Sequence, residues 1–218
     1  MIVAIDGPAG SGKSTIARLL AQRLNFLYLD TGAMYRALTL KVLQMNIDLD
    51  DYENIIVQAK NTEIEFKDEK VFLDSADVTS DIRLPQVDKS ISSIAKIPEV
   101  REEMVKIQRS IGCSTDCVVE GRDTTTVVFP DAKLKIFLDA RFSQRAKRRL
   151  GDFRQKGIDV DIKSLETDLK ARDTADMTRA VGPLKKASDC VYVDTTDLTI
   201  DEVVSRVYSL AENKLKIK

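Results

Sequence analysis

Histidine is absent from this sequence of 218 residues, and its absence excludes several kinds of active site. The chain cannot build a His-ligated zinc site, a Ser-His-Asp triad or a histidine general base. Cysteine is scarce, because only Cys113, Cys117 and Cys190 occur, and this odd number is not a disulfide framework. We interpret the three as incidental thiols of a reducing compartment.

A large net charge and a long apolar run are also missing. The formal net charge of -1, from 34 basic and 35 acidic residues, gives no electrostatic reason to expect a nucleic-acid or membrane partner. The apolar run at residues 2–5 ends at Asp6 and Gly7, so it is too short for a signal peptide or a membrane span. We therefore expect a cytoplasmic protein, and we expect it to be a monomer.

Short apolar segments alternate with helical patterns along the chain. Apolar residues at helical spacing fill residues 14–24, directly after the first segment. This alternation predicts an α/β fold with a parallel sheet and helices on both faces. The segments that we interpret as buried strands are residues 2–5, 26–29, 117–119, 134–138 and 191–193.

Residues 63–82 break the alternation. Residues 63–66 and 71–73 flank a polar turn at 67–70, which predicts a β-hairpin, and residues 76–82 are expected to add a third strand. Helical patterns lie on both sides, near 34–45 and 86–96. The sequence therefore predicts an inserted subdomain with a small sheet.

A second break is the charged stretch at 141–176, which includes Arg145, Arg148 and Arg149. One interpretation is a pair of solvent-exposed charged helices. The other is a lid that closes over phosphates. The motifs described next favour the lid.

A phosphate-binding loop follows the first predicted strand. Residues 7–14, GPAGSGKS, match the pattern G-x4-G-K-[ST] in full. The glycines let main-chain N–H groups converge on phosphate, Lys13 is expected to reach the β- and γ-phosphates, and the Ser14 hydroxyl is expected to ligate magnesium (Mg²⁺). The residues expected to bind the nucleoside triphosphate are Gly7, Pro8, Ala9, Gly10, Ser11, Gly12, Lys13, Ser14 and Thr15.

Other motifs of P-loop proteins point away from two classes. The chain has no Asn-Lys-x-Asp box, which a regulatory GTPase needs for guanine. The closest run to the apolar-acidic motif of motor and transporter ATPases is Val118-Val119-Glu120, and it continues as Gly-Arg-Asp. We therefore expect a kinase of a small molecule.

Several arginines stand at motif-like positions. Arg36 closes the run Asp30-Thr31-Gly32-Ala33-Met34-Tyr35-Arg36 after a predicted strand, and Arg122 lies in Gly121-Arg122-Asp123 after another. Arg172 and Arg179 flank Asp176. Ligands of open α/β sheets lie beyond the carboxyl ends of the strands, and transfer between two phosphates needs cations around both. A phosphate acceptor is itself an oxyanion, so no strong base is required.

These motifs together resemble those of bacterial cytidylate kinases (CMP kinases, type 1), a branch of the nucleoside monophosphate kinase family, over nearly the full length of the chain. The matching stretches are IDGPAGSGKST at 5–15, LDTGAMYR at 29–36, PEVR at 98–101, EGRD at 120–123, TVVFPDA at 126–132, RDxxDxxR at 172–179, PL at 183–184 and AxD at 187–189. The second, fourth and fifth are far more specific than the phosphate loop alone.

The resemblance implies a P-loop NTPase fold with a five-stranded parallel core, an inserted domain for the nucleoside monophosphate (NMP) and a short helical lid. We assign residues 1–36, 97–142 and 173–218 to the core, 37–96 to the NMP-binding domain and 143–172 to the lid. It also implies ATP as donor, Mg²⁺ as cofactor, and CMP and dCMP as acceptors. The reaction would be transfer of the γ-phosphoryl group of ATP, with Lys13, Arg122 and Arg179 as the catalytic residues.

The same resemblance assigns the acceptor site. Ser92, Arg101 and Asp123 would read the cytosine edge, and an Asp carboxylate suits the cytosine amino group. Tyr35 would line the base pocket, and Thr31 would lie near the nucleotide. The remaining residues are those for the acceptor phosphate, Arg36, Arg122 and Arg179, and those for the ribose, Arg172 and Asp176.

One pair of residues departs from the family pattern. Thr124 and Thr125 stand where the family usually has an apolar residue followed by glycine. If this backbone needs a positive φ, a β-branched residue there is costly. The departure supports one alternative function, a nucleotide-binding protein without activity. A kinase of another nucleotide or of a coenzyme A precursor also stays open, because such enzymes share the phosphate loop, although they are not expected to carry the Gly-Arg-Asp stretch.

Overall fold

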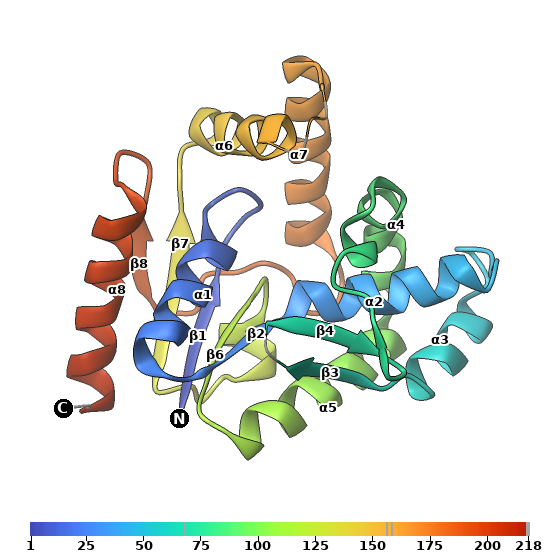
Figure 1. The fold of residues 1–218 in the computed structure, drawn as a ribbon, viewed down its shortest axis with the longest axis horizontal. Coiled ribbons are helices and arrows are strands. Elements are labelled where there is room, and N and C mark those ends of the chain that lie inside the picture. The colour runs from blue at the N-terminus through green and yellow to red at the C-terminus, as the bar shows by residue number, and fades with distance from the viewer. Residues whose placement is uncertain (68, 156, 158, 217–218) are drawn as a thin grey trace. The chain divides into compact units, whose positions relative to one another are not determined.

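Five strands form the main sheet of the computed structural model, which describes residues 1–67, 69–155, 157 and 159–216 (Figure 1). The strand order is β2-β6-β1-β7-β8, and β1 pairs in parallel with both β6 and β7. This is the predicted P-loop α/β architecture. The strands are β1 (Ile2–Asp6), β2 (Leu27–Asp30), β6 (Cys117–Gly121), β7 (Leu134–Asp139) and β8 (Val191–Asp194).

Helices α1 (Lys13–Leu24) and α8 (Ile200–Leu215) pack with the sheet to form one apolar core. Ile16 and Leu20 of α1 meet Val3 and Ile5 of β1 there, as the helical spacing of apolar residues predicted. A capping box at the start of α8, in which Thr199 and Glu202 bond each other's backbone, fixes where that helix begins. The five predicted strands and the first predicted helix are thus confirmed.

The charged stretch forms two helices, α6 (Phe142–Gln155) and α7 (Ile162–Thr178). The Asp161 side chain caps α7 by accepting the N–H of Ser164 at 2.9 Å. Residues 156 and 158, which belong to the predicted lid, lie outside the described residues. Within the described ranges, none of the helices combines the length and the apolar composition needed to cross a membrane.

A second, antiparallel sheet has the strand order β3-β4-β5, with β3 (Ile64–Lys67), β4 (Lys70–Leu73) and β5 (Ala76–Asp77). Ile64 pairs with Leu73 and Lys67 with Lys70, which confirms the predicted hairpin. Asp68, in the predicted polar turn, lies outside the described residues.

The predicted third strand at 76–82 is too long. β5 ends at Asp77, whose side chain accepts the N–H and the hydroxyl of Thr79 and so turns the chain. A short 3-10 helix, η1 (Asp81–Arg83), follows. Side-chain bonds to the local backbone therefore overrode the apolar alternation of this segment.

Four helices accompany the small sheet: α2 (Thr31–Gln44), α3 (Tyr52–Lys60), α4 (Pro85–Ala95) and α5 (Pro98–Ser114). Helix α2 begins earlier than the predicted residue 34, because Asp30 caps it by accepting the N–H of Ala33 at 2.9 Å. Helix α4 begins at Pro85, a favoured first residue.

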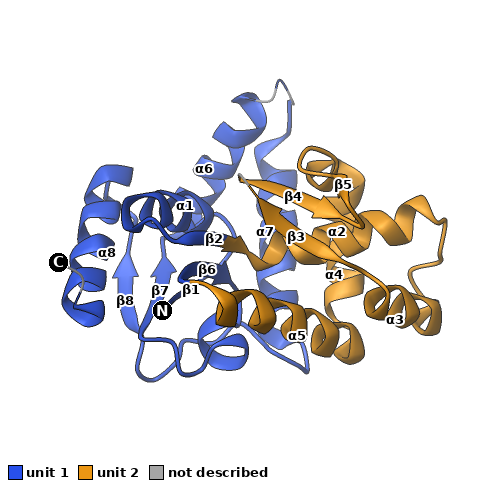
Figure 2. Ribbon diagram, turned by 60° about the horizontal axis from the view of Figure 1, so that its bottom comes forward, with its two compact units in different colours: residues 1–28, 116–218 blue, residues 29–115 orange. Residues whose placement is uncertain are grey.

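The chain divides into two compact units (Figure 2). Residues 1–28 and 116–218 form one, and residues 29–115 form the other. The first holds the phosphate loop together with α6 and α7, and the second holds the small sheet. The finer division into core, NMP-binding domain and lid stays a prediction.

Candidate active site

The phosphate loop joins β1 to α1 at the carboxyl ends of the parallel strands. A Cβ added to Gly7 would lie 1.9 Å from the backbone oxygen of Leu138 in β7, so only glycine fits there. Gly12 precedes α1 with a φ of +95°. The first N–H groups of α1 have no acceptor within the helix, and the positive end of its dipole adds to them. The segment is therefore built to bind an anion.

Lys13 is buried at the start of α1, where its Nζ donates to the backbone oxygen of Pro8 at 2.8 Å. Burial, together with the positive charge of Arg122, lowers the pKa of Lys13 to about 7, against the opposing effect of Glu120. The carboxylates of Asp176 and Asp6 also oppose the charge of Arg122 at Lys13. A bound phosphate would add further negative charge beside the two cations.

Ser14 donates its hydroxyl to Oε1 of Glu120 at 2.6 Å, and the Tyr28 hydroxyl lies 3.4 Å from the same oxygen. Glu120 is buried in β6, beside Ile5 of β1. Glu120 is not among the residues predicted from the sequence, although it directly follows the apolar run at 118–119 that is the closest match to the apolar-acidic motif of ATPases. Its position beside Ser14 makes it a candidate site residue.

Asp6, the last residue of β1, is fully buried and accepts four hydrogen bonds. They come from the backbone N–H and the hydroxyl of Thr124, at 2.8 and 2.7 Å, and from those of Thr125, at 2.7 and 2.6 Å. Burial raises the pKa of Asp6, and these bonds oppose the rise.

The departure at Thr124 and Thr125 therefore carries no backbone strain. The pair begins a π-helical turn, η2 (Thr124–Val128), and neither residue takes a positive φ. Both hydroxyls are used by Asp6 instead. A β-branched residue is therefore compatible with the backbone conformation at both positions.

Arg122, Asp123, Asp176 and Arg179 form one ion-pair network. Arg122 donates to Asp176 at 2.7 Å, and Arg179 lies 3.3 Å from Asp123 and 3.7 Å from Asp176. Burial acts to raise the pKa of Asp176, but the charges of Arg122 and Arg172 lower it below its usual value. Together with Arg172, these four residues place five of the predicted acceptor residues in the unit that carries the phosphate loop.

Side chains of α6 and α7 also bind the backbone of the phosphate loop. Arg145 donates to the Ala9 carbonyl at 2.9 Å and to the Asp173 carboxylate of α7 at 2.5 Å, while Asp173 also accepts the Ala9 N–H at 3.3 Å. Arg145 and Asp173 are both more than nine-tenths buried. The two side chains therefore bind both the backbone carbonyl and the backbone N–H of Ala9.

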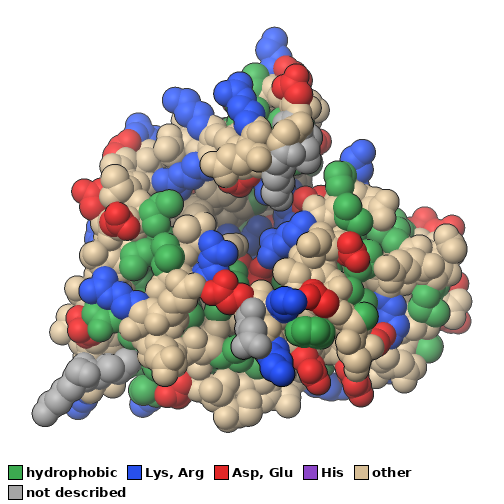
Figure 3. Space-filling model, in the orientation of Figure 1, with side chains coloured by type: hydrophobic (Ala, Val, Ile, Leu, Met, Phe, Trp, Pro, Cys, Tyr) green, Lys and Arg blue, Asp and Glu red, His purple; other side chains and the backbone are tan. Residues whose placement is uncertain are grey.

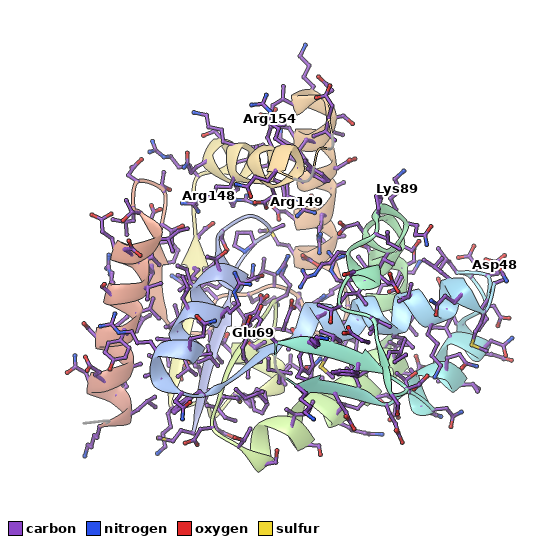
Figure 4. The ribbon with its side chains drawn as sticks, in the orientation of Figure 1. Asp48, Glu69, Lys89, Arg148, Arg149 and Arg154 are labelled. Atoms are coloured by element: carbon purple, nitrogen blue, oxygen red, sulfur yellow. The ribbon has the colours of Figure 1, made fainter. Side chains whose placement is uncertain are left out.

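Arg148 makes a second contact from α6. It lies 3.3 Å from the Ser11 carbonyl and donates to the Thr195 carbonyl at 2.6 Å, and Figure 4 shows it reaching toward the loop. Figure 3 shows further Lys and Arg side chains gathered over the surface of α6. The sequence had placed the lid arginines by region only; the structure shows that two of them bind the loop backbone.

The other predicted acceptor residues lie in residues 29–115. Arg36 is paired with Asp88 of α4 at 2.5 Å and donates to the Ile82 carbonyl, and the Arg101 guanidinium lies 5.3 Å from the centre of the Tyr35 ring. Thr31 is buried at the first position of α2, and Ser92 is exposed on α4. The structure thus gathers the predicted residues in two groups, one in each unit.

A family model described as "Cytidylate kinase" matches residues 3–213 of the chain. The protein of Alkaliphilus oremlandii named "Cytidylate kinase" is 50% identical over 208 residues, which cover 95% of this chain and 96% of that protein. Proteins of the same name from Lactobacillus johnsonii and Caldanaerobacter subterraneus are 45% and 47% identical and cover 99% and 98% of this chain, in each case over 96% of the relative.

Solved structures share the fold at low sequence identity. An uncharacterized protein from Eubacterium ventriosum superposes with a TM-score of 0.54 at 15% identity, over 98% of both chains. TT1252 from Thermus thermophilus gives a TM-score of 0.50 at 14% identity, over 99% of this chain and 97% of the other. At this identity the likeness concerns the fold alone.

Proposed function

Because the chain belongs to the cytidylate kinase family, we propose that it transfers the γ-phosphoryl group of ATP to CMP and dCMP. A phosphate oxygen of CMP attacks the γ-phosphorus, the bond from that phosphorus to the β,γ-bridging oxygen breaks, and ADP leaves with the electron pair. No proton needs to be removed from the acceptor phosphate. The absence of histidine is consistent with this chemistry.

The single observation that carries the proposal is a pair of cations at the phosphate loop, the buried Lys13 and the partly buried Arg122. Burial and the positive charge of Arg122 lower the pKa of Lys13, and a bound phosphate would oppose both effects. Transfer between two phosphates concentrates negative charge between donor and acceptor. We propose that Lys13 binds the donor phosphates and that Arg122 and Arg179 stabilise the group in transit.

We assign the acceptor residues from the family resemblance and the two groups described above. Asp123 accepts from the cytosine amino group, and Ser92 and Arg101 donate to the base. Arg36 binds the acceptor phosphate with Arg122 and Arg179, and Arg172 and Asp176 bind the ribose. The existing ion pairs of Arg36 with Asp88 and of Arg122 with Asp176 would then exchange partners when CMP binds.

Mg²⁺ would be held by Ser14 and Glu120. Both are oxygen ligands of the kind that Mg²⁺ prefers, and their oxygens already lie 2.6 Å apart. Among the described residues no group of three or more acidic or cysteine side chains could hold a metal, so the ion would share phosphate oxygens of ATP. When bound, Mg²⁺ neutralises charge that develops on the phosphates.

A Glu120→Gln variant tests this assignment. Gln keeps the hydrogen bond to Ser14 but lacks the charge, so we expect the Mg²⁺ concentration for half-maximal activity to rise by about tenfold, with weaker Mn²⁺ binding in the presence of ATP by electron paramagnetic resonance. The exposed Glu212→Gln of α8 is the matched control. An unchanged Mn²⁺ affinity would remove Glu120 from the site.

A panel of acceptors tests the proposed function directly. We expect kcat/KM to be highest with CMP and dCMP, because uracil presents an acceptor where cytosine presents an amino donor to Asp123. Turnover that favours UMP or AMP tenfold would contradict the cytosine assignment. In the same panel, Arg122→Ala should remove turnover of CMP. If the protein were instead a kinase of a coenzyme A precursor, this variant would still bind its acceptor.

A further inference from the structure

The Asp6 carboxylate joins the two loops that carry the proposed catalytic cations. Asp6 directly precedes Gly7, the first residue of the phosphate loop, and Thr124 directly follows Arg122 and Asp123. The four hydrogen bonds to Asp6 range from 2.6 to 2.8 Å and use both carboxylate oxygens. Each oxygen receives one backbone N–H and one hydroxyl, so translation and rotation of the turn are both restrained.

The burial of this contact makes it strong. Asp6, Thr124 and Thr125 are each at most 2% exposed. Water cannot replace a lost bond there, and hydrogen bonds to a charged group are worth more in a dry site than in solvent. The backbone on both sides is also constrained, because Gly7 lies against the Leu138 oxygen and η2 begins at Thr124.

The electrostatics give this geometry a role in the reaction. Arg122 acts on Lys13 as a repulsive charge, and Asp6 is among the carboxylates that oppose this repulsion. Two cations that repel one another before substrate binds need a rigid connection to stay near the productive geometry.

We propose that Asp6, held by the hydroxyls of Thr124 and Thr125, is a positioning residue that fixes Arg122 relative to Lys13 for phosphoryl transfer. Asp6 touches neither substrate in this proposal and acts through the two loops. The inference rests on the proposed function. It predicts a loss in kcat with little change in the KM of either nucleotide, since the binding groups themselves remain.

The test replaces single hydroxyls in this turn. We expect Thr125→Val, which keeps the shape and the backbone N–H, to lower kcat by about tenfold. KM for ATP and CMP should stay within about twofold, and Thr125→Ser should restore most of the native rate. Thr124→Val is the second variant, because it removes one bond to the other oxygen of Asp6 and should act in the same way.

Thr126→Val is the matched control in the same turn. The Thr126 hydroxyl is buried and has no hydrogen-bond partner in the part of the chain that the structure describes, so its loss should leave kcat unchanged. Circular dichroism and melting curves select an assay temperature at which all variants are folded.

The outcomes separate this inference from the proposed function. A native protein that does not phosphorylate CMP would overturn the proposed function. If the native protein is active, native kcat in both Thr125→Val and Thr124→Val would overturn the positioning role. An equal loss in Thr126→Val, or a loss confined to KM, would do the same, because either would indicate general packing or substrate binding.

Discussion

Replacing Lys13 by methionine is expected to lower kcat by about 1000-fold and, at pH 7, to raise the free energy of unfolding by about 1–3 kcal/mol. Catalysis is lost because the positive charge at the donor phosphates is gone. Stability rises because Lys13 is 4% exposed and carries its charge beside Arg122. Methionine fills the same space and removes this repulsion.

The pH dependence follows from the sign of the pKa shift. The pKa of Lys13 is about 7 in the folded chain, lowered from 10.5 by burial and by Arg122. The unfolded chain therefore binds more protons between these values, so the stability of the native protein rises with pH in that window. The advantage of Lys13→Met should be largest at or below pH 7 and should fade toward pH 10.

Two measurements check this prediction. Urea unfolding at pH 7 and pH 9 gives the stability difference, with the exposed Lys163→Met of α7 as the control for charge removal. Calorimetry at pH 8 in buffers of different ionisation enthalpy should show proton uptake when ATP binds the native protein, because phosphate restores the charge on Lys13. A Lys13→Met variant that is less stable than the native protein would contradict the argument.

Asp173→Ala is expected to lower the free energy of unfolding by about 3–5 kcal/mol, the cost of leaving a buried charge without its partner. Arg145 is 7% exposed and would lose its bond of 2.5 Å to Asp173. The Ala9 N–H of the phosphate loop would lose its acceptor as well. We therefore expect a melting temperature lower by roughly 10 °C together with weaker ATP binding.

The exposed Asp168→Ala on the same helix, α7, is the control for this variant. It removes a negative charge as Asp173→Ala does, but it leaves no buried cation without a partner. A double variant, Arg145→Met with Asp173→Leu, should recover much of the lost stability, because two apolar side chains replace the pair without an unpaired charge. It should not recover the ATP affinity, because the hydrogen bonds from Arg145 and to Asp173 at the Ala9 backbone are absent. Equal melting temperatures for Asp173→Ala and Asp168→Ala would refute the prediction.

The sequence by itself determined the phosphate loop, the five strands of the main sheet and the hairpin. These features depend on residues that are neighbours along the chain: glycines that permit the loop backbone, apolar residues at the period of a strand or helix, and a polar turn. It overextended the third strand of the small sheet, because Asp77 and Thr79 form a local turn that periodicity does not reveal.

Only the tertiary structure decided which charged residues meet. Glu120 reaches Ser14 across 106 positions, Asp6 reaches Thr124 across 118, and Asp173 reaches Ala9 across 164. No local pattern encodes such pairs, since each joins segments that only the fold brings side by side. The same reason explains Thr124 and Thr125, which looked like a defect in the motif and prove to be the hydrogen-bond donors that a buried carboxylate requires.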